Sequence, residues 1–193
     1  MASIAAYVLA GGKSTRMGSE KALVTLEGRS LLARAVETVG SVTNVVAIVG
    51  DREKFSSFAS VIEDVFAGCG PLSGIHAALR ASQCDLNLIV AVDMPFVSAA
   101  LCNFLLARAQ NAADSDAIVP RAGERLQPLC AVYRRSFATL AEAALRAGHF
   151  KINPLFDAAK SVIVEEEELQ AAGFPGRMFH NVNTPAELSE AGS

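Results

Sequence analysis

Short, continuously apolar runs alternate with longer stretches of mixed character over the first 110 residues of the chain. Such runs are typical of strands buried on both faces, since a strand with one wet face would alternate apolar and polar residues. The predicted strands cover residues 4–10, 45–49, 61–62 and 86–92. The predicted helices cover residues 31–39, 72–81 and 99–109, with Ser30 capping the first and Ser98 the third. This alternation predicts an α/β fold with a doubly wound, mostly parallel sheet and helices on both faces, a Rossmann-like arrangement.

The second part of the chain has a less regular pattern. Its predicted elements are strands at 117–119 and 129–133 around a polar turn at 121–127, a helix at 137–147 and a strand at 161–164. The acidic stretch from Glu165 to Glu168 is interpreted as the solvated start of a helix rather than as a metal site. Thr184 predicts a last helix with Pro185 at its first position. We find no repeat or linker, so residues 1–193 are expected to form one domain.

Composition narrows the class of protein. The 193 residues are 51% hydrophobic and 19% charged, which suits a buried sheet and argues against disorder. The formal net charge of -3 suggests no nucleic-acid partner, and no apolar run reaches the ~20 residues of a membrane span. The four cysteines share no spacing that indicates a zinc site or a disulfide framework, so free thiols in a reducing compartment are expected. Residues 1–9 form a first strand rather than a signal peptide, and a cytoplasmic location follows.

The segment LAGGKSTRMG, residues 9–18, combines features that suit a triphosphate. Gly11 and Gly12 follow a predicted strand directly, so backbone N–H groups there can approach an anion closely. Lys13, Arg16 and Lys21 add three positive charges within nine positions, about the charge that a triphosphate carries. Ligands of open α/β sheets bind at the carboxyl ends of strands, where this loop lies. The loop predicts a nucleoside triphosphate site, with a merely basic surface loop as the alternative.

Two familiar glycine motifs do not fit this loop. A P-loop has the pattern GxxxxGK[ST], but counting back from Gly12-Lys13-Ser14 puts its first glycine at Tyr7, inside the strand. The dinucleotide fingerprint GxGxxG is absent from the loop as well. What is left is a nucleotide site of another class, so the first part of the chain, residues 1–110, is expected to be its nucleotide-binding half.

Two carboxylates are candidates for work at this site. Asp93 follows the buried strand 86–92 directly, so it is aimed into the crevice, and Mg²⁺ on a nucleotide prefers one or two carboxylates plus phosphate oxygens. Asp64 follows the short strand at 61–62 and suits a ribose or base contact. A turn-capping role is the alternative for each. No two histidines share metal-ligand spacing.

The segments that carry these residues resemble, nearly along the whole chain and in order, the molybdenum cofactor guanylyltransferases. The similar segments are LAGGKSTRMGSEKALVTLEGRSLL, IED, GCGPLSGIHAAL, VAVDMPF, RLQPLCAVY and FHNVNTPAEL. The first segment alone marks only the wider nucleotidyltransferase superfamily, whereas the last one points to this branch. The resemblance implies a doubly wound fold and transfer of GMP from GTP to molybdopterin, with release of pyrophosphate and with Mg²⁺ as cofactor.

The resemblance also implies roles for particular residues. The expected catalytic residues are Arg16, Lys21 and Asp93, with Asp93 holding the metal. The residues expected to bind nucleotide, metal or pterin are Leu9, Ala10, Gly11, Gly12, Lys13, Lys21, Asp51, Asp64, Asp93, Asn181 and Asn183. Asn181 and Asn183 resemble a polar pair on the pterin side, so residues 111–193 are expected to be the acceptor-substrate half. Arg121 and Arg125 either face the pterin or are surface charges.

One position departs from the family's pattern, and two other functions stay open. The family often has Asn where Asp51 stands, and Asp accepts a guanine N–H but donates nothing. A cytidylyltransferase acting on molybdopterin or a sugar phosphate is the first alternative, although Gly11 favours a purine because related cytidylyltransferases tend to have Ala there. A non-catalytic nucleotide-binding module is the second. We expect a monomer that makes transient contacts with cofactor-biosynthesis proteins and acceptor molybdoenzymes.

Overall fold

The computed structural model describes residues 2–11 and 21–182, and the predicted helix after Thr184 lies outside them. Its strands are β1 Ile4–Leu9, β2 Thr25–Leu26, β3 Arg29–Ser30, β4 Val46–Val49, β5 Ser60–Ile62, β6 Leu86–Ala91, β7 Ala117–Ala122, β8 Arg125–Leu126, β9 Cys130–Arg134 and β10 Ser161–Val164. Its α-helices are α1 Leu31–Gly40, α2 Arg52–Phe55, α3 Pro71–Ala81, α4 Ala99–Asn111, α5 Phe137–Arg146, α6 Leu155–Ala158 and α7 Glu166–Ala171. Two short 3₁₀ helices are η1 Lys21–Leu23 and η2 Gly176–Phe179.

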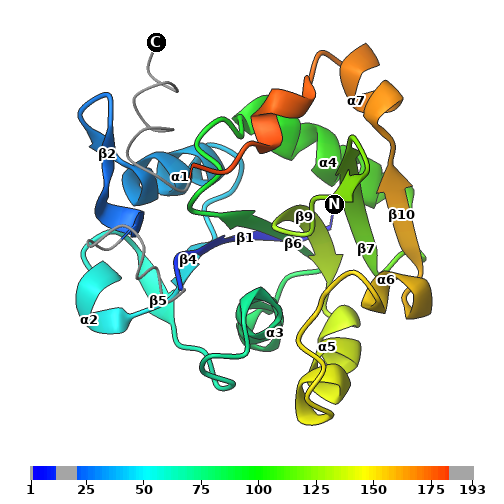
Figure 1. Ribbon diagram of the computed structural model, residues 1–193, viewed down its shortest axis with the longest axis horizontal. Coiled ribbons are helices and arrows are strands. Elements are labelled where there is room, and N and C mark those ends of the chain that lie inside the picture. The colour runs from blue at the N-terminus through cyan, green and yellow to red at the C-terminus, as the bar shows by residue number, and fades with distance from the viewer. Residues whose placement is uncertain (1, 12–20, 183–193) are drawn as a thin grey trace.

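A mixed, mostly parallel sheet runs through the middle of the molecule (Figure 1). Its strand order is β10-β7-β9-β6-β1-β4-β5, with β8 paired to β7 outside this path. β5, β4, β1 and β6 are mutually parallel, and β9 is antiparallel to both of its neighbours. In chain order, the first four strands of this sheet are β1, β4, β5 and β6. Across the sheet they lie in the order 3-2-1-4, which is that of a doubly wound fold, so the predicted fold class is confirmed.

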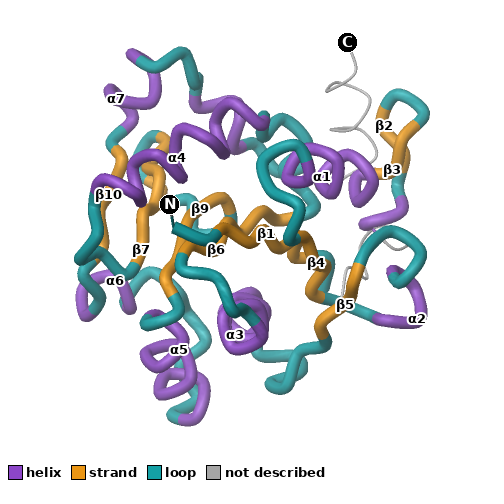
Figure 2. The backbone as a smooth tube through the Cα atoms, turned by 180° about the vertical axis from the view of Figure 1, so that it is seen from behind, coloured by secondary structure: helices purple, strands orange, loops and turns teal. Residues whose placement is uncertain are grey.

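Helices cover both faces of the sheet. α1 and α4 lie on one face and α3 and α5 on the other, and the views in Figures 1 and 2 agree on this division. The side chains of β1 separate accordingly: Ala6 and Val8 enter the core beneath α1 and α4, whereas Ala5 and Tyr7 enter the core beneath α3 and α5. Because both faces of β1 and β6 are buried, their sequences are continuously apolar, which is the pattern that predicted them.

Local capping chemistry sets where several helices begin. The Ser30 hydroxyl accepts from the Ala33 N–H at the start of α1, and the Ser98 hydroxyl accepts from the Leu101 N–H at the start of α4, as the sequence predicts. The acidic stretch that begins at Glu165 is the first turn of α7, where carboxylates interact favourably with the helix dipole. Its interpretation as a helix start is therefore confirmed, and no cluster of metal-ligating residues occurs among the residues described.

Three short features differ from the predicted pattern. The expected turn at 121–127 is a hairpin, because β7 continues to Ala122 and β8 pairs with it, which leaves Gly123 at φ 58 in the turn. A second hairpin joins β2 to β3 through Glu27 and Gly28, which both have positive φ, as a tight hairpin turn requires. The third is the set of short helices α2, α6, η1 and η2, which have three or four residues each. Elements this short bury little and have no periodicity, so the hydrophobic pattern does not predict them.

All four cysteines are free thiols, as expected from their spacing. Cys102 and Cys130 are buried, and Cys69 and Cys84 are partly exposed. Within residues 2–11 and 21–182, no helix has the length and apolar character needed to cross a membrane.

Candidate functional site

The carboxyl ends of four parallel strands stand in one row across the sheet. The strand register pairs Ile62 with Val49, Val49 with Leu9 and Leu9 with Ala91. Two positions beyond each member of this row, on the same edge of the sheet, the chain has Asp64, Asp51, Gly11 and Asp93. We call these four residues the ligand edge. Register alone therefore brings together three predicted carboxylates and the start of the glycine loop.

The ligand edge also lies where the strand order reverses. From β1 the chain proceeds outward to β4 and β5 on one side, and then returns to place β6 on the other side of β1. The crossover connections consequently diverge above β1 and β6, and ligands of open α/β sheets bind in the crevice that this leaves at the carboxyl ends. Gly11 and Asp93 follow the two strands that flank this switch point.

Lys21 and Asp93 meet in this crevice. The Lys21 Nζ atom lies 2.8 Å from Asp93 Oδ2, and the two side chains are only 14% and 21% exposed. η1 presents Lys21: the Val24 N–H donates to the Lys21 carbonyl, and the Val24 carbonyl accepts from the Leu31 N–H at the start of α1. A charged pair this far from water is strongly coupled, because the protein interior screens charge poorly. Two of the three predicted catalytic side chains, those of Lys21 and Asp93, are therefore in direct contact.

The second oxygen of Asp93 has different surroundings. Asp93 Oδ1 is buried, and it has no hydrogen-bond partner among the residues that the structure describes. An unsatisfied buried carboxylate oxygen is costly, so such an atom is a candidate for a ligand contact. A hard cation that takes one protein carboxylate and completes its shell with phosphate oxygens and water fits this donor, and Mg²⁺ has this preference.

The end of the described chain returns to Asp93. The Val182 N–H donates to the Asp93 carbonyl at 2.9 Å, and the preceding side chain, Asn181, is exposed. Asn181 is thus brought close to the Asp93 main chain, although 88 positions (181 - 93) separate the two residues in the sequence. Asn183, the second member of this polar pair, lies outside the described residues, as do Gly12, Lys13 and Arg16.

Leu9 and Ala10 reach the crevice only with their backbones. Both side chains are buried, at 8% and 6% exposure. The Leu9 side chain packs against Gly74 of α3, and a Cβ atom added to Gly74 would lie 3.4 Å from it. Gly11 is exposed, its φ lies outside the left-handed region, and an added Cβ would come no closer than 3.8 Å to the Val49 carbonyl oxygen. No contact with the described residues therefore requires glycine at position 11, which leaves room for a ligand as the reason.

The other two carboxylates of the ligand edge have local partners. Asp51 Oδ1 accepts from the N–H groups of Glu53 and Lys54 at the start of α2, and Oδ2 pairs with Lys54 Nζ at 3.2 Å. The hydrogen bond from the Lys54 side chain lowers the pKa of Asp51. Asp64 Oδ1 accepts from the Phe66 N–H at 2.8 Å. A capping role accounts for Asp51 without a ligand. For Asp64, the described contacts occupy only one of the two carboxylate oxygens.

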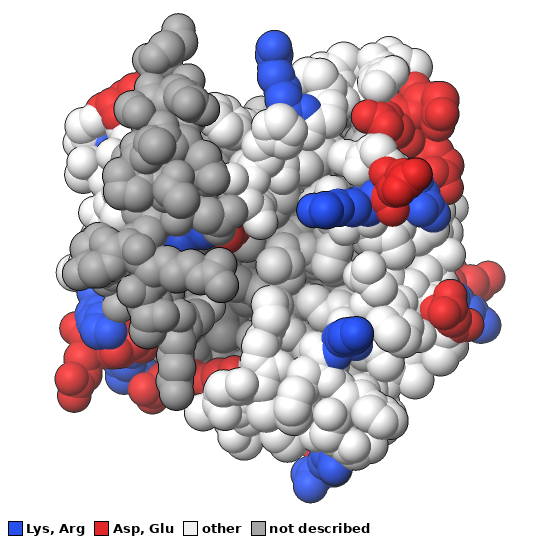
Figure 3. All heavy atoms as spheres, in the orientation of Figure 1, with Lys and Arg blue, Asp and Glu red and all other residues white. Residues whose placement is uncertain are grey.

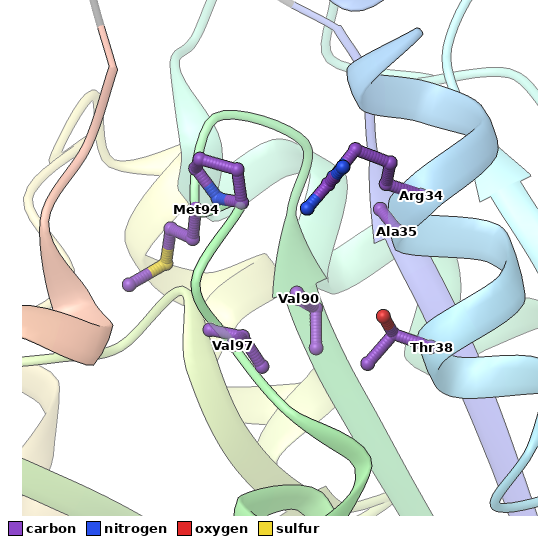
Figure 4. Close-up of a pocket in the computed structure, with 7 residues that line it drawn as sticks. Arg34, Ala35, Thr38, Val90, Met94 and Val97 are labelled. Carbon is purple, nitrogen blue, oxygen red and sulfur yellow. The ribbon is translucent and has the colours of Figure 1, made fainter. Parts of the chain in front are cut away.

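A small hollow lies behind the Asp93 turn, between α1 and β6 (Figure 4). Its lining residues are Arg34, Ala35, Thr38, Val90, Met94, Pro95 and Val97. The volume of about 10 Å³ is enough for one water molecule and too small for a substrate. Arg34 donates from this wall to the Leu26 carbonyl and to Glu27, and so fastens the β2–β3 hairpin to α1. Sequence reasoning missed this residue, whose only signal is an arginine within the apolar start of α1.

Charge is not concentrated on the face shown in Figure 3. Outside the residues drawn in grey, acidic and basic side chains are interspersed and lie mostly toward its rim. Arg121 belongs to such a pair, because its Nε atom donates to Glu165 Oε2 at 2.8 Å. Arg125, at the start of β8, is exposed. For Arg121, this ion pair supports the interpretation as a surface charge.

A mostly parallel sheet with a lysine–aspartate pair at the strand ends beside its switch point is typical of nucleotide-binding α/β proteins. Comparison with known proteins narrows this class. Residues 6–162 match the family of the MobA-like NTP transferase domain, so the chain belongs to that family and is a nucleotidyltransferase.

Similar proteins cover almost the full chain. A probable molybdenum cofactor guanylyltransferase of Pelotomaculum thermopropionicum is 38% identical over 95% of this chain and 89% of its own length. A molybdenum cofactor guanylyltransferase of Desulfosudis oleivorans is 31% identical over 99% of this chain and 95% of its own. The crystal structure of molybdopterin-guanine dinucleotide biosynthesis protein A from Archaeoglobus fulgidus superposes with a TM-score of 0.83 at 33% identity, over 96% of this chain and 95% of that one.

Proposed function

We propose that the protein transfers GMP from GTP to molybdopterin, which forms the guanine dinucleotide cofactor and releases pyrophosphate. The observation that carries the transferase chemistry is the Lys21–Asp93 pair at the switch point, with one buried Asp93 oxygen left over. The choice of GTP and molybdopterin rests on the relatives, since proteins named for this reaction are similar along nearly the whole chain.

The reaction needs no nucleophile from the protein. A phosphate oxygen of molybdopterin attacks the α-phosphorus of GTP and forms a new P–O bond. The bond from the α-phosphorus to the bridging oxygen breaks, and its electron pair leaves with pyrophosphate. Catalysis then depends on placing the two substrates and on offsetting negative charge, as in other phosphoryl transfers. Bound Mg²⁺ would supply a Lewis acid on the phosphates.

Lys21 and Asp93 would exchange partners when the nucleotide binds. Without nucleotide the two charges neutralise each other at 2.8 Å. With nucleotide, Asp93 would turn to the metal and Lys21 to the triphosphate, assisted by Lys13 and Arg16 from the glycine loop. The site would thus stay electrically balanced in both conditions, which avoids the cost of an isolated buried charge. Asn181 and Asn183 would face the pterin, while Gly11, Gly12 and the backbones of Leu9 and Ala10 would line the nucleotide.

Asp64 and Asp51 would contribute unequally to nucleotide binding. Asp64 has an oxygen outside the Phe66 turn contact and would accept from the ribose or base. Asp51 would accept from guanine only by weakening the α2 cap, because its two oxygens already have partners. We propose that the enzyme acts as a cytoplasmic monomer, and that cofactor-biosynthesis proteins and acceptor molybdoenzymes contact it transiently.

The test combines binding with turnover. Thermal unfolding is measured with GTP, CTP, ATP or UTP, each with and without Mg²⁺, and we expect the largest stabilisation from GTP with Mg²⁺. A ligand at one hundred times its Kd stabilises by about 2.7 kcal/mol, which such melts resolve. Pyrophosphate release is then measured with GTP and molybdopterin. Preferential stabilisation by CTP would overturn the guanine assignment, and GTP binding without pyrophosphate release would indicate a non-catalytic module.

The variant Asp93→Asn distinguishes the role of Asp93 in metal binding from its role in the ion pair with Lys21. Asparagine keeps the shape but cannot anchor the metal as a charged ligand, so turnover should fall on the order of a hundredfold or more. In EDTA the same variant should bind GTP at least as tightly as the wild type, because the Asp93 carboxylate no longer competes with the triphosphate for Lys21. Calorimetric titrations with and without Mg²⁺ measure this, and unchanged turnover of folded Asp93→Asn would exclude the assignment.

A further inference from the structure

The segment that carries Asp64 is attached to the rest of the molecule by an aromatic side chain. Residues 63–70 connect the edge strand β5 to α3 and contain neither helix nor strand. Val65 in this segment is 79% exposed, whereas the next residue, Phe66, is partly buried. The position of the segment therefore depends strongly on what the Phe66 ring contacts.

The Phe66 ring lies between two helices that follow it in the chain. It meets the His76 ring of α3 edge to face, with centroids 5.3 Å apart and planes at 75°. The guanidinium carbon of Arg146, the last residue of α5, lies 5.9 Å from the Phe66 centroid. Edge-to-face pairs and cation–π contacts each add to the stability that buried area supplies. One ring thus fastens the segment to both α3 and α5.

The partners of Phe66 are themselves held in place. Arg146 donates from Nε and Nη2 to Glu142 Oε1, at 2.9 and 2.7 Å, one helical turn back along α5. These hydrogen bonds lower the pKa of Glu142, whose other oxygen lies 3.6 Å from Nε2 of the buried His76. Phe66, His76, Glu142 and Arg146, the Phe66 cluster, are therefore linked around a closed ring of contacts. The Phe66 ring is thus contacted from α3 and from α5 by side chains that also lie beside Glu142.

Phe66 is coupled to the carboxylate of Asp64 through its backbone. The Phe66 N–H donates to Asp64 Oδ1 at 2.8 Å, so the orientation of the carboxylate depends on where the Phe66 main chain stands. Asp64 lies on the ligand edge, two positions beyond the row that includes Leu9 and Ala91. We propose that Phe66 is a positioning residue for GTP binding: the Phe66 cluster holds the Asp64 turn so that its second oxygen is aimed at the nucleotide. This rests on the proposed function, because it uses Asp64 as a nucleotide contact.

The test compares Phe66→Ala with Phe150→Ala, a matched loss of a phenyl ring at a position that is 46% exposed. Phe66→Ala should raise KM and Kd for GTP on the order of tenfold, since one lost ring contact is of that size. Its kcat should change less than about twofold, because Lys21 and Asp93 are untouched. Phe66→Tyr keeps the ring and should restore GTP binding, and Phe150→Ala should leave both constants unchanged. A fall in kcat with constant KM would overturn the inference.

A double-mutant cycle shows whether Phe66 acts through Asp64. If it does, Phe66→Ala adds little to the loss already caused by Asp64→Ala, whereas independent contributions multiply. If the effects of the two substitutions on Kd multiply, the inference is contradicted and the proposed function stays intact. The same holds if Asp64→Ala binds GTP weakly while Phe66→Ala binds it normally. If Phe66→Ala does not fold, Arg146→Ala keeps the phenyl ring, removes the guanidinium from Phe66 and Glu142, and should raise KM in the same direction. Absence of GTP binding by the wild-type protein would instead exclude the proposed function itself.

Discussion

At the scale of single residues, Gly11 of the ligand edge and Gly50, which lies close to it in space, are glycine for different reasons. A Cβ at Gly50 would stand 3.0 Å from two atoms of the Phe55 ring, which is tighter than nine in ten real Cβ contacts and would force the ring to shift. A Cβ on Gly11 would stand 3.8 Å from the Val49 carbonyl oxygen, an ordinary contact. Packing therefore accounts for Gly50, and it does not account for Gly11, which fits a close approach of the nucleotide instead.

The pair of variants Gly50→Ala and Gly11→Ala tests this difference. Gly50→Ala should lower the free energy of unfolding by about 1–3 kcal/mol, the usual cost of overpacking. Gly11→Ala should change it by less than about 0.5 kcal/mol, as for most surface substitutions, while weakening GTP relative to CTP. Urea unfolding measures the first quantity and competition binding the second. A Gly11→Ala protein with unchanged preference for GTP would show that this position does not select the base.

At the scale of elements, hydrogen bonds fix how β1 and β6 start together. Asp85 Oδ2 accepts from both the N–H and the hydroxyl of Ser3 at 2.9 Å, and the Ser3 hydroxyl accepts from the Asp85 N–H at 3.0 Å. The backbone N–H of Ser3, followed by its hydroxyl, lowers the pKa of Asp85. Because β1 and β6 flank the switch point, this clasp at their amino ends helps to set the register that delivers Gly11 and Asp93 at the other ends.

Lowering the pH should break the hydrogen bonds between Ser3 and Asp85. The folded protein holds the pKa of Asp85 below its ordinary value of about 3.9, so the unfolded chain binds a proton first as pH falls. The stabilisation is complete above that value and is lost as pH drops through the lower, folded pKa. Asp85→Asn should therefore melt below the wild type at pH 7, and the gap should close toward about pH 2. Thermal melts across this range measure it, with the exposed Asp114→Asn as the charge-matched control.

At the scale of the whole molecule, the sheet divides the interior into two cores that protect the thiols unequally. Cys102 and Cys130 lie together in the core beneath α1 and α4, and burial raises the pKa of Cys102 to about 12 and that of Cys130 well above its ordinary value. Cys69 and Cys84 lie at the edge of the other core and are partly exposed. Access to the first pair therefore requires the sheet and its helices to separate.

Thiol labelling at pH 8 should then occur in two phases. Cys69 and Cys84 should react readily in the native protein. Cys102 and Cys130 should react only as fast as the molecule opens, because in the folded protein solvent does not reach them and their thiols stay protonated. Mass spectrometry of labelled peptides assigns the phases. GTP with Mg²⁺ should slow the second phase in proportion to the stability it adds. Fast native labelling of Cys102 would mean that this core opens locally.

The amino-acid sequence by itself determined the central strands, the main helices and their caps. Strands buried on both faces must be continuously apolar, and Ser30 and Ser98 act on N–H groups three positions away, so the information is local. It also determined that Gly11, at the start of the glycine loop, and Asp93 follow the ends of strands. The short pieces, α2 and the hairpins at Glu27 and Gly123, could not be predicted because they bury too little to impose a pattern.

Only the tertiary structure decided which of the candidate residues meet. Lys21 and Asp93 are 72 positions apart and form a pair because β1 and β6 are neighbours in one register, which no local pattern encodes. The same row of strand ends aligns Asp64 with Gly11, and packing of α3 against α5 places the Phe66 ring. Burial likewise left one oxygen of Asp93 with no partner among the described residues. Local preference selects the elements, whereas contacts between distant segments create the site, because its charges and hydrogen bonds exist only once the sheet is assembled.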